Sequence, residues 1–278
     1  MQVGDVVRNS GLAAIDGVRQ LPAAAQDLGF ASIWLTDHVV GQRAFTVYEP
    51  EWAEILVALG HAAATTSTIR LGTGVLVVPY RDPVLTAKML STIDNLSDGR
   101  LVVGIGAGWA RGEFAALGRA EFFDRRGEIV DESLKIMLRC WQGGEFSWEG
   151  DRFAFGRMTF EPTPAQRPRP PIWVGGQSKA ALRRAARIAD AWHPTNISPD
   201  EVATLGARLD ELAGRTVPRT IRLRIDESDL DGAPELLARY EHAGCVEAAV
   251  QISQPRYSVD SQLSAMRRLA ATVGLSRP

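Results

Sequence analysis

The stretch PIWVGGQSKAALRRAARI, residues 171–188, contains the unit from which the chain is built. Pro171–Val174 is a short apolar run typical of a buried strand, and Gly175 and Gly176 form a turn without side chains. The Ala-, Leu- and Arg-rich residues after Ser178 are typical of a helix. The stretch therefore predicts one strand–turn–helix unit of a parallel α/β fold.

The same alternation of short β-branched runs and longer amphipathic stretches extends along the whole chain. Helix signals are clear at Asp82, which precedes Pro83–Leu96, and at Ser198-Pro199, which opens a helix running to about Ala213. The predicted strands are Gln2–Val7, Ser32–Thr36, Ile69–Val75, Leu101–Ile105, Pro171–Val174, Ala191–His193, Thr220–Ile225 and Ala248–Ile252. Eight parallel strands in a chain of 278 residues predict a (β/α)8 TIM barrel, a fold of about 250 residues. No repeat or linker divides the chain, so residues 1–278 are expected to form a single domain.

Residues 143–171 interrupt the alternation. Aromatic residues recur there at two-residue spacing, and five prolines follow between Pro162 and Pro171, so a helix cannot run through the segment. We expect an insertion of short extended pieces between the fourth helix and the fifth strand, folded over the barrel mouth.

Composition excludes several classes of function. The net charge of −2 and pI of about 6.1 lack the basic footprint of a nucleic-acid-binding protein. Two isolated cysteines, Cys140 and Cys245, exclude a disulfide scaffold and a zinc site. The N-terminus shows no signal-peptide pattern and no apolar run is long enough to cross a membrane, so we expect a cytoplasmic protein without a membrane or nucleic-acid partner.

A barrel of this type forms its active site at the C-terminal ends of the strands, which selects a small set of candidate residues. The second strand is followed by the candidate catalytic pair Asp37 and His38. The candidate ligand-binding residues at the third, fourth and fifth strands are Thr73, Gly74, Val75, Gly106, Ala107, Gly108, Trp109, Gly175, Gly176 and Gln177.

Each candidate has a functional and a structural interpretation. The bare turn at Gly175–Gln177 before a helix favours an anion such as a phosphate, but it is equally compatible with a tight turn capped by Ser178. The glycines of Gly104–Gly108 either let a flat ligand lie against the backbone or form a structural turn, and Trp109 breaks the dinucleotide fingerprint. His38 could transfer protons near neutral pH; alternatively, Asp37 caps the next segment and His38 makes a packing hydrogen bond.

Other chemistry has less support. The sequence contains no nucleophile elbow, no phosphate-binding P-loop and no HExxH helix, which leaves hydrolase and kinase interpretations without their usual motifs. We expect the charge runs Arg125-Arg126 and Arg183-Arg184 to lie on helix surfaces.

Several blocks in fixed order resemble the bacterial luciferase-like monooxygenase superfamily, particularly its coenzyme F420-dependent oxidoreductases. The blocks are LGFASIWLTDH at 28–38, RLGTGV at 70–75, PYRDP at 79–83, LSDGRL at 96–101, GIGAGW at 104–109 and PPIWVGG at 170–176. The resemblance implies a TIM barrel with a flavin or deazaflavin in its mouth. It also implies a non-proline cis peptide, here Gly74–Val75, behind the ring, His38 near the reactive carbon, and the cofactor phosphate at Gly175–Gln177.

One departure matters. In the sugar-phosphate dehydrogenases of this superfamily a glutamate follows the Gly-x-Gly of the fourth strand, and here that position is Trp109. Both the proton donor to the cofactor ring and a sugar-phosphate substrate are therefore in question.

The leading hypothesis is a coenzyme F420-dependent oxidoreductase that transfers a hydride between the deazaflavin and a small organic substrate, with His38 as acid/base and Asp37 orienting it. The first alternative is an FMN-dependent monooxygenase served by a partner reductase. The second is a flavin- or deazaflavin-binding protein without turnover, because Trp109 replaces a carboxylate. The resemblance also suggests a homodimer, and loops at residues 8–11 and 39–50 are expected to shape the substrate pocket.

Overall fold

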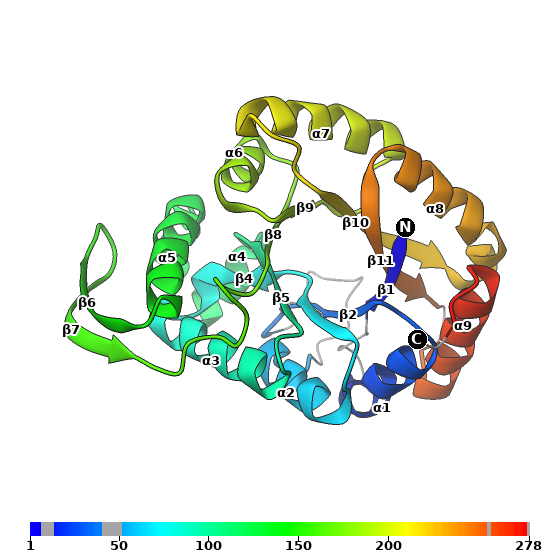
Figure 1. Cartoon of the computed structure of the whole chain (residues 1–278), viewed down its shortest axis with the longest axis horizontal. Helices are drawn as coiled ribbons and strands as arrows, with labels where there is room; N and C mark the ends of the chain where they lie inside the picture. Colours follow the sequence, from blue (N-terminus) through cyan, green and yellow to red (C-terminus); the bar gives the residue numbers. More distant parts are fainter. Residues whose placement is uncertain (7–13, 41–51, 255–256, 277–278) are drawn as a thin grey trace.

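A computed structural model describes residues 1–6, 14–40, 52–254 and 257–276 of the chain. The strands of its larger sheet surround a central axis, and its helices form an outer ring (Figure 1). The helices are α1 (Ala14–Asp27), α2 (Ile55–Thr65), α3 (Pro83–Leu96), α4 (Arg111–Ala116), α5 (Arg126–Trp141), α6 (Lys179–Ile188), α7 (Pro199–Ala213), α8 (Ala233–His242) and α9 (Val259–Thr272). The strands are β1 (Gln2–Val6), β2 (Ser32–Leu35), β3 (Arg70–Thr73), β4 (Leu76–Val77), β5 (Leu101–Gly106), β6 (Gly144–Glu149), β7 (Ala154–Phe160), β8 (Ile172–Gly175), β9 (Ala191–His193), β10 (Arg219–Asp226) and β11 (Cys245–Ser253).

The predicted barrel is confirmed. The sheet runs in the order β3-β2-β1-β11-β10-β9-β8-β5-β4, and the additional pairing of β3 with β5 closes it. Every pairing in this sheet is parallel, for example Leu71 with Leu101 and Val103 with Ile172. The predicted third strand is divided into β3 and β4 around Gly74–Val75, whose peptide bond is cis, as the resemblance implied.

Local sequence signals define the starts of several helices. Asp82 caps α3 by accepting hydrogen bonds from the backbone N–H groups of Val84 and Leu85. Ser198 and Glu201 form a reciprocal capping box at the start of α7. The short predicted strand Ala191–His193 is observed with the same bounds as β9.

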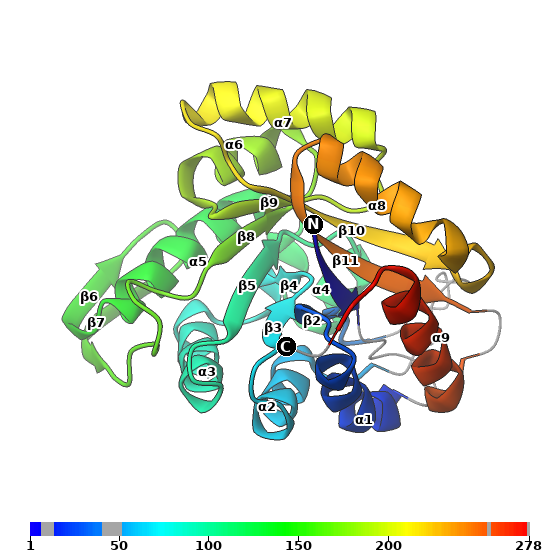
Figure 2. The same cartoon turned by 45° about the vertical axis from the view of Figure 1, so that its right-hand side comes forward.

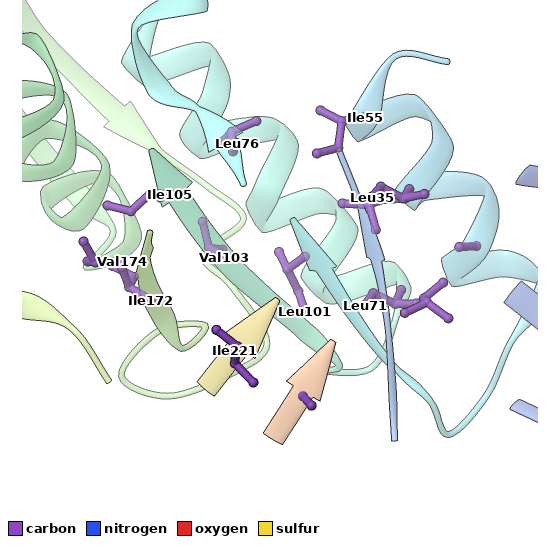
Figure 3. Close-up of a cluster of buried hydrophobic side chains, with 14 of the residues drawn as sticks. Leu35, Ile55, Leu71, Leu76, Leu101, Val103, Ile105, Ile172, Val174 and Ile221 are labelled. Carbon is purple, nitrogen blue, oxygen red and sulfur yellow. The ribbon is translucent and has the colours of Figure 1, made fainter. Parts of the chain in front are cut away.

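Two layers of apolar side chains hold the barrel. Between strands and helices lies a continuous core that includes Leu35, Leu71, Val103 and Ile221 (Figure 3). Inside the barrel, the Trp34 ring lies 4.7 Å from that of Trp173 and 4.9 Å from that of His193. A Cβ at Gly72 would lie 2.2 Å from the Trp34 ring, so glycine there makes room for the indole.

The prediction that residues 143–171 cover the mouth is wrong. β6 and β7 form an antiparallel hairpin that projects away from the barrel beside α5 (Figures 1 and 2). Trp148 Nε1 donates to Glu132 of α5 at 3.3 Å, and Ser91 of α3 donates to the carbonyl of Pro162 at 2.6 Å. The insertion connects the end of α5 to the start of β8, and helix-to-strand connections lie at the end of the barrel opposite the active site.

Within the described ranges, no helix is long and apolar enough to span a membrane. Those same ranges contain no cluster of His, Cys, Asp and Glu side chains suited to a metal ion. Cys140 and Cys245 are both buried free thiols.

Candidate functional site

A cleft of about 790 Å³ opens at the C-terminal ends of the barrel strands. Eleven of the twelve predicted site residues line it: Asp37, His38, Gly74, Val75, Gly106, Ala107, Gly108, Trp109, Gly175, Gly176 and Gln177. Thr73 does not, because its buried hydroxyl donates to the carbonyl of Gly104 at 2.7 Å. Thr73 therefore ties β3 to β5 behind the cleft. The predicted pocket loop at residues 8–11, and residues 41–50 of the predicted loop at 39–50, lie outside the described residues.

The glycines of the mouth surround the side chain of Val75. A Cβ at Gly106 would lie 2.6 Å from Val75 Cγ2, and one at Gly175 would lie 3.0 Å from Val75 Cγ1. Glycines on β5 and β8 thus allow Val75 to project between the strands. The result is an apolar surface against which a flat ring can pack.

His38 is held by a buried carboxylate that sequence analysis did not identify. Its Nδ1 lies 3.0 Å from Glu113 Oε2, and the Glu113 side chain has no exposed surface. The Tyr80 hydroxyl donates to the same oxygen at 2.9 Å, while the backbone N–H of Val39 donates to Oε1 at 2.8 Å. Glu113 therefore fixes the orientation of His38 at the edge of the cleft.

The surroundings of Glu113 keep it ionised. Burial raises the pKa of Glu113, but hydrogen bonds from His38, Val39 and Tyr80 together outweigh burial and leave its pKa below the ordinary value. Burial and the negative charge of Glu113 both raise the pKa of Tyr80, so this phenol stays a neutral donor.

Two aromatic rings flank the His38 imidazole. The Trp52 ring centroid lies 4.5 Å from that of His38, and the Trp109 ring lies 6.1 Å away, edge-on. Trp109 is 57% exposed, which is consistent with its predicted place as a wall of the cleft.

Asp37 does not orient His38, contrary to the sequence-based hypothesis. Both of its carboxylate oxygens bind Arg81, at 2.6 and 2.8 Å, and Oδ2 accepts the backbone N–H of Val77 at 2.8 Å. Arg81 also binds Glu54, whose side chain caps α2. Asp37 and His38 both follow the end of β2, and they bind different partners, Arg81 and Glu113.

The other end of the cleft suits an anion. Gly176 has a φ of +95°, and Ser178 caps α6 by accepting the N–H of Ala181 at 3.2 Å. The first N–H groups of a helix attract negative charge.

Two arginines line the cleft beside this helix start. Arg184 is only 8% exposed and binds Asp131 at 2.7 Å, while Arg126 donates to the carbonyl of Gly108 at 3.0 Å. Both residues line the cleft, whereas Arg125 and Arg183 are exposed. The prediction that these pairs lie on helix surfaces is thus wrong for the second residue of each pair.

The chain belongs to the luciferase-like monooxygenase family, whose profile matches residues 3–225. Among curated proteins it is similar to the FMNH2-dependent dimethylsulfone monooxygenase of Pseudomonas putida, with 33% identity over 204 residues. This match covers 72% of the chain and 53% of the relative. The chain therefore matches only about half the length of that relative.

Solved structures share the fold. The monooxygenase RslO1 from Streptomyces bottropensis superposes with a TM-score of 0.80 at 22% identity, covering 98% of both chains. An F420-dependent secondary alcohol dehydrogenase, solved with an F420-acetone adduct, superposes with the same TM-score of 0.80 at 16% identity and 98% coverage of both chains. A monooxygenase and an F420-dependent dehydrogenase thus have this architecture.

Proposed function

We propose that the chain is an oxidoreductase that binds coenzyme F420 in the mouth cleft and transfers a hydride to or from a small organic substrate. The observation that carries the proposal is the arrangement of the cleft. An imidazole backed by a buried carboxylate lies at one end, and a helix start flanked by Arg126 and Arg184 lies at the other.

The residues present fit such a cofactor. A cleft of about 790 Å³ lies within the usual range for cofactor sites, roughly 300–1,000 Å³. The N–H groups at the start of α6, with Arg126 and Arg184, would hold the phosphate, and Val75 would support the ring. When bound, the deazaflavin supplies a carbon that accepts or donates a hydride.

The protein's part in the reaction is to position the cofactor and the substrate, to exclude water and to move a proton. With Nδ1 of His38 held by Glu113, we propose that Nε2 exchanges a proton with the substrate as the hydride moves. Trp109 and Trp52 exclude water around the imidazole. Glu113 places a carboxylate against His38 rather than at the position of Trp109, so it supports proton transfer by His38 and leaves the donor to the cofactor ring unassigned. A flavin- or deazaflavin-binding protein without turnover stays the third candidate.

An FMN-dependent monooxygenase is the second candidate, because the curated relative from Pseudomonas putida carries that cofactor dependence in its name. The ribityl phosphate and tricyclic ring are common to both cofactors, so the cleft would accept either. Only the FMN-dependent monooxygenase would need a partner reductase. We propose a homodimer for either candidate.

Equilibrium titration of the purified protein with F420 and, separately, with FMN tests the proposal. We expect quenching of cofactor fluorescence with tighter binding of F420. Preference for FMN would support the second candidate, and binding of neither would contradict the assignment of the cleft.

A further inference from the structure

The cleft has a second cationic wall, distant in sequence from α6. Arg222 and Arg224 are two residues apart on β10, so both side chains leave the same face of the strand, and both line the cleft. The neighbouring strand β11 contributes Gln251 and Ser253 to the same wall. Figure 1 shows β10 and β11 side by side.

The two arginines differ in how they are held. Arg222 reaches across the mouth and donates to Gly74 O, to Thr36 Oγ1 at 3.1 Å and to Gln251 Oε1 at 2.9 Å. These hydrogen bonds fix its guanidinium in the floor of the cleft.

Arg224 lies at the rim. Its Nη2 donates to Ser253 Oγ at 2.7 Å, and its side chain is 54% exposed. Asp226 Oδ1 lies 3.9 Å from its Nε and is itself in an exposed side chain. An exposed ion pair of that length contributes little, so a ligand anion can compete for the guanidinium.

The charge of the cleft differs from that of the chain. Arg126, Arg184, Arg222 and Arg224 line it against Asp37 and Asp124, whereas the whole chain has a net charge of −2. Asp37 is bound by Arg81, Asp124 by Arg111 and Arg184 by Asp131, which leaves Arg126, Arg222 and Arg224 as the positive charges of the cleft. A positive cleft in an acidic protein concentrates anions. The proposed cofactor phosphate explains why Arg126 and Arg184 line the cleft. It does not explain Arg222 and Arg224 on β10.

We propose that Arg224, above the fixed charge of Arg222, binds an oxyanion of the substrate, such as a carboxylate or a sulfonate. The Ser253 hydroxyl lies beside the guanidinium and adds a polar neighbour. Loops after the seventh and eighth strands of such barrels are a common place for anions, and β10 and β11 are those strands here. This inference rests on the proposed function, because the anion belongs to the molecule that reacts near His38.

Methanesulfonate and dimethyl sulfone are nearly the same shape and differ in charge, which makes them suitable probes. Each probe is titrated into the protein by isothermal titration calorimetry. The protein is first saturated with whichever cofactor binds, so that the proposed phosphate site at the start of α6 is already occupied. We expect methanesulfonate to bind more tightly than dimethyl sulfone. Arg224→Gln should weaken methanesulfonate binding by roughly tenfold or more, since a charged hydrogen bond is lost.

The matched control is Arg208→Gln, which removes the same charge from an exposed position on α7. This variant should bind methanesulfonate as the wild type does. Equal binding by the Arg224→Gln protein, or equal binding of the two probes, would overturn the inference. So would an Arg224→Gln protein that loses affinity for F420 alone, because Arg224 would then serve the cofactor tail.

The inference and the proposed function can fail separately. If neither cofactor binds, the proposed function fails, and the cofactor-free protein is titrated instead. Methanesulfonate binding that depends on Arg224 would still support the oxyanion site in that case.

Discussion

Two buried glutamates at opposite ends of one barrel differ in their partners. At the mouth, Glu113 lies against the His38 imidazole and accepts a hydrogen bond from the Tyr80 hydroxyl. At the closed end, Glu247 accepts hydrogen bonds from the Ser32 hydroxyl and from the guanidinium of Arg70. Both carboxylates are almost fully buried, with exposed fractions of 0% and 2%.

The difference lies in what the partner can do. A guanidinium is a permanent positive charge, so Arg70 gives Glu247 a fixed counterion that stabilises the barrel. At the mouth the partner is an imidazole, the side chain that enzymes use most often as a general acid or base, and His38 lines the cleft. We therefore propose that the same residue type is structural at the closed end and serves the chemistry at the mouth, in line with the general difference between the two ends of these barrels.

The largest expected effect is on catalysis at the mouth. With the cofactor and substrate that the titrations identify, His38→Ala should lower turnover by roughly 100- to 10,000-fold, the usual contribution of a general acid or base. Cofactor affinity should stay close to that of the wild type. The exposed His61 of α2 provides the control variant His61→Ala, and equal loss in both variants would remove His38 from the mechanism.

At the closed end, the expected effect is on stability. Glu247→Ala leaves the charge of Arg70 without its carboxylate and should lower the free energy of unfolding by about 3 kcal/mol. Urea denaturation measures the change, and cofactor affinity of the folded variant should be unaltered. A stable variant with impaired cofactor binding would contradict the division between the two ends.

Asp5 on β1 extends the comparison to a buried carboxylate without hydrogen-bond partners among the described residues. Burial raises the pKa of Asp5 to about 7 from an ordinary value of 3.8. Its folded form therefore binds a proton that the unfolded form has lost, and wild-type stability should fall as the pH rises from 3.8 to about 7. Asp5→Asn should be the more stable protein above pH 7 and lose that advantage near pH 4.

The gain should be smaller than the loss in Glu247→Ala, because the replacing amide is itself a buried polar group. Thermal unfolding of the wild type and of Asp5→Asn between about pH 4 and pH 7 measures this gain in stability. A difference that is constant with pH would show that Asp5 does not titrate.

Glu113 should show the opposite pH dependence with a smaller amplitude. Because its folded pKa lies below the ordinary value of 4.5, its stabilising contribution is present above that pH and is lost as the pH falls through the folded pKa. Glu113→Gln should flatten this acid-side loss. Parallel stability curves for the two proteins would mean that the His38–Glu113 contact does not stabilise the ionised carboxylate.

The fold could be predicted from the sequence because its signals are local. Apolar strand runs, helix caps such as Asp82 and glycine turns such as Gly175-Gly176 each act within a few residues. The same locality allowed His38 and the Gly175–Gln177 turn to be predicted in one cleft, since both follow strands of a single barrel.

The partners of these residues depend on long-range geometry and could not be predicted in this way. Glu113 lies on α4 and contacts His38 in the segment after β2, so no spacing in the sequence links the two residues. The position of the β6–β7 hairpin depends on the end of the barrel at which the insertion begins, and the sequence pattern of the insertion does not indicate that end. Arg222 and Arg224 could have been found from the sequence, since they stand two residues apart near the end of the seventh predicted strand and so lie on the same face of it.

The central claim is that the mouth cleft binds a phosphorylated ring cofactor with its phosphate at the start of α6. Comparing the affinity of the protein for FMN with that for riboflavin, and for F420 with that for its unphosphorylated deazaflavin fragment, tests this claim most directly. We predict that the phosphorylated partner binds roughly tenfold or more tightly in at least one pair, because charged hydrogen bonds to the phosphate are gained. Arg126→Gln should narrow that difference. Equal affinities within both pairs would contradict the account.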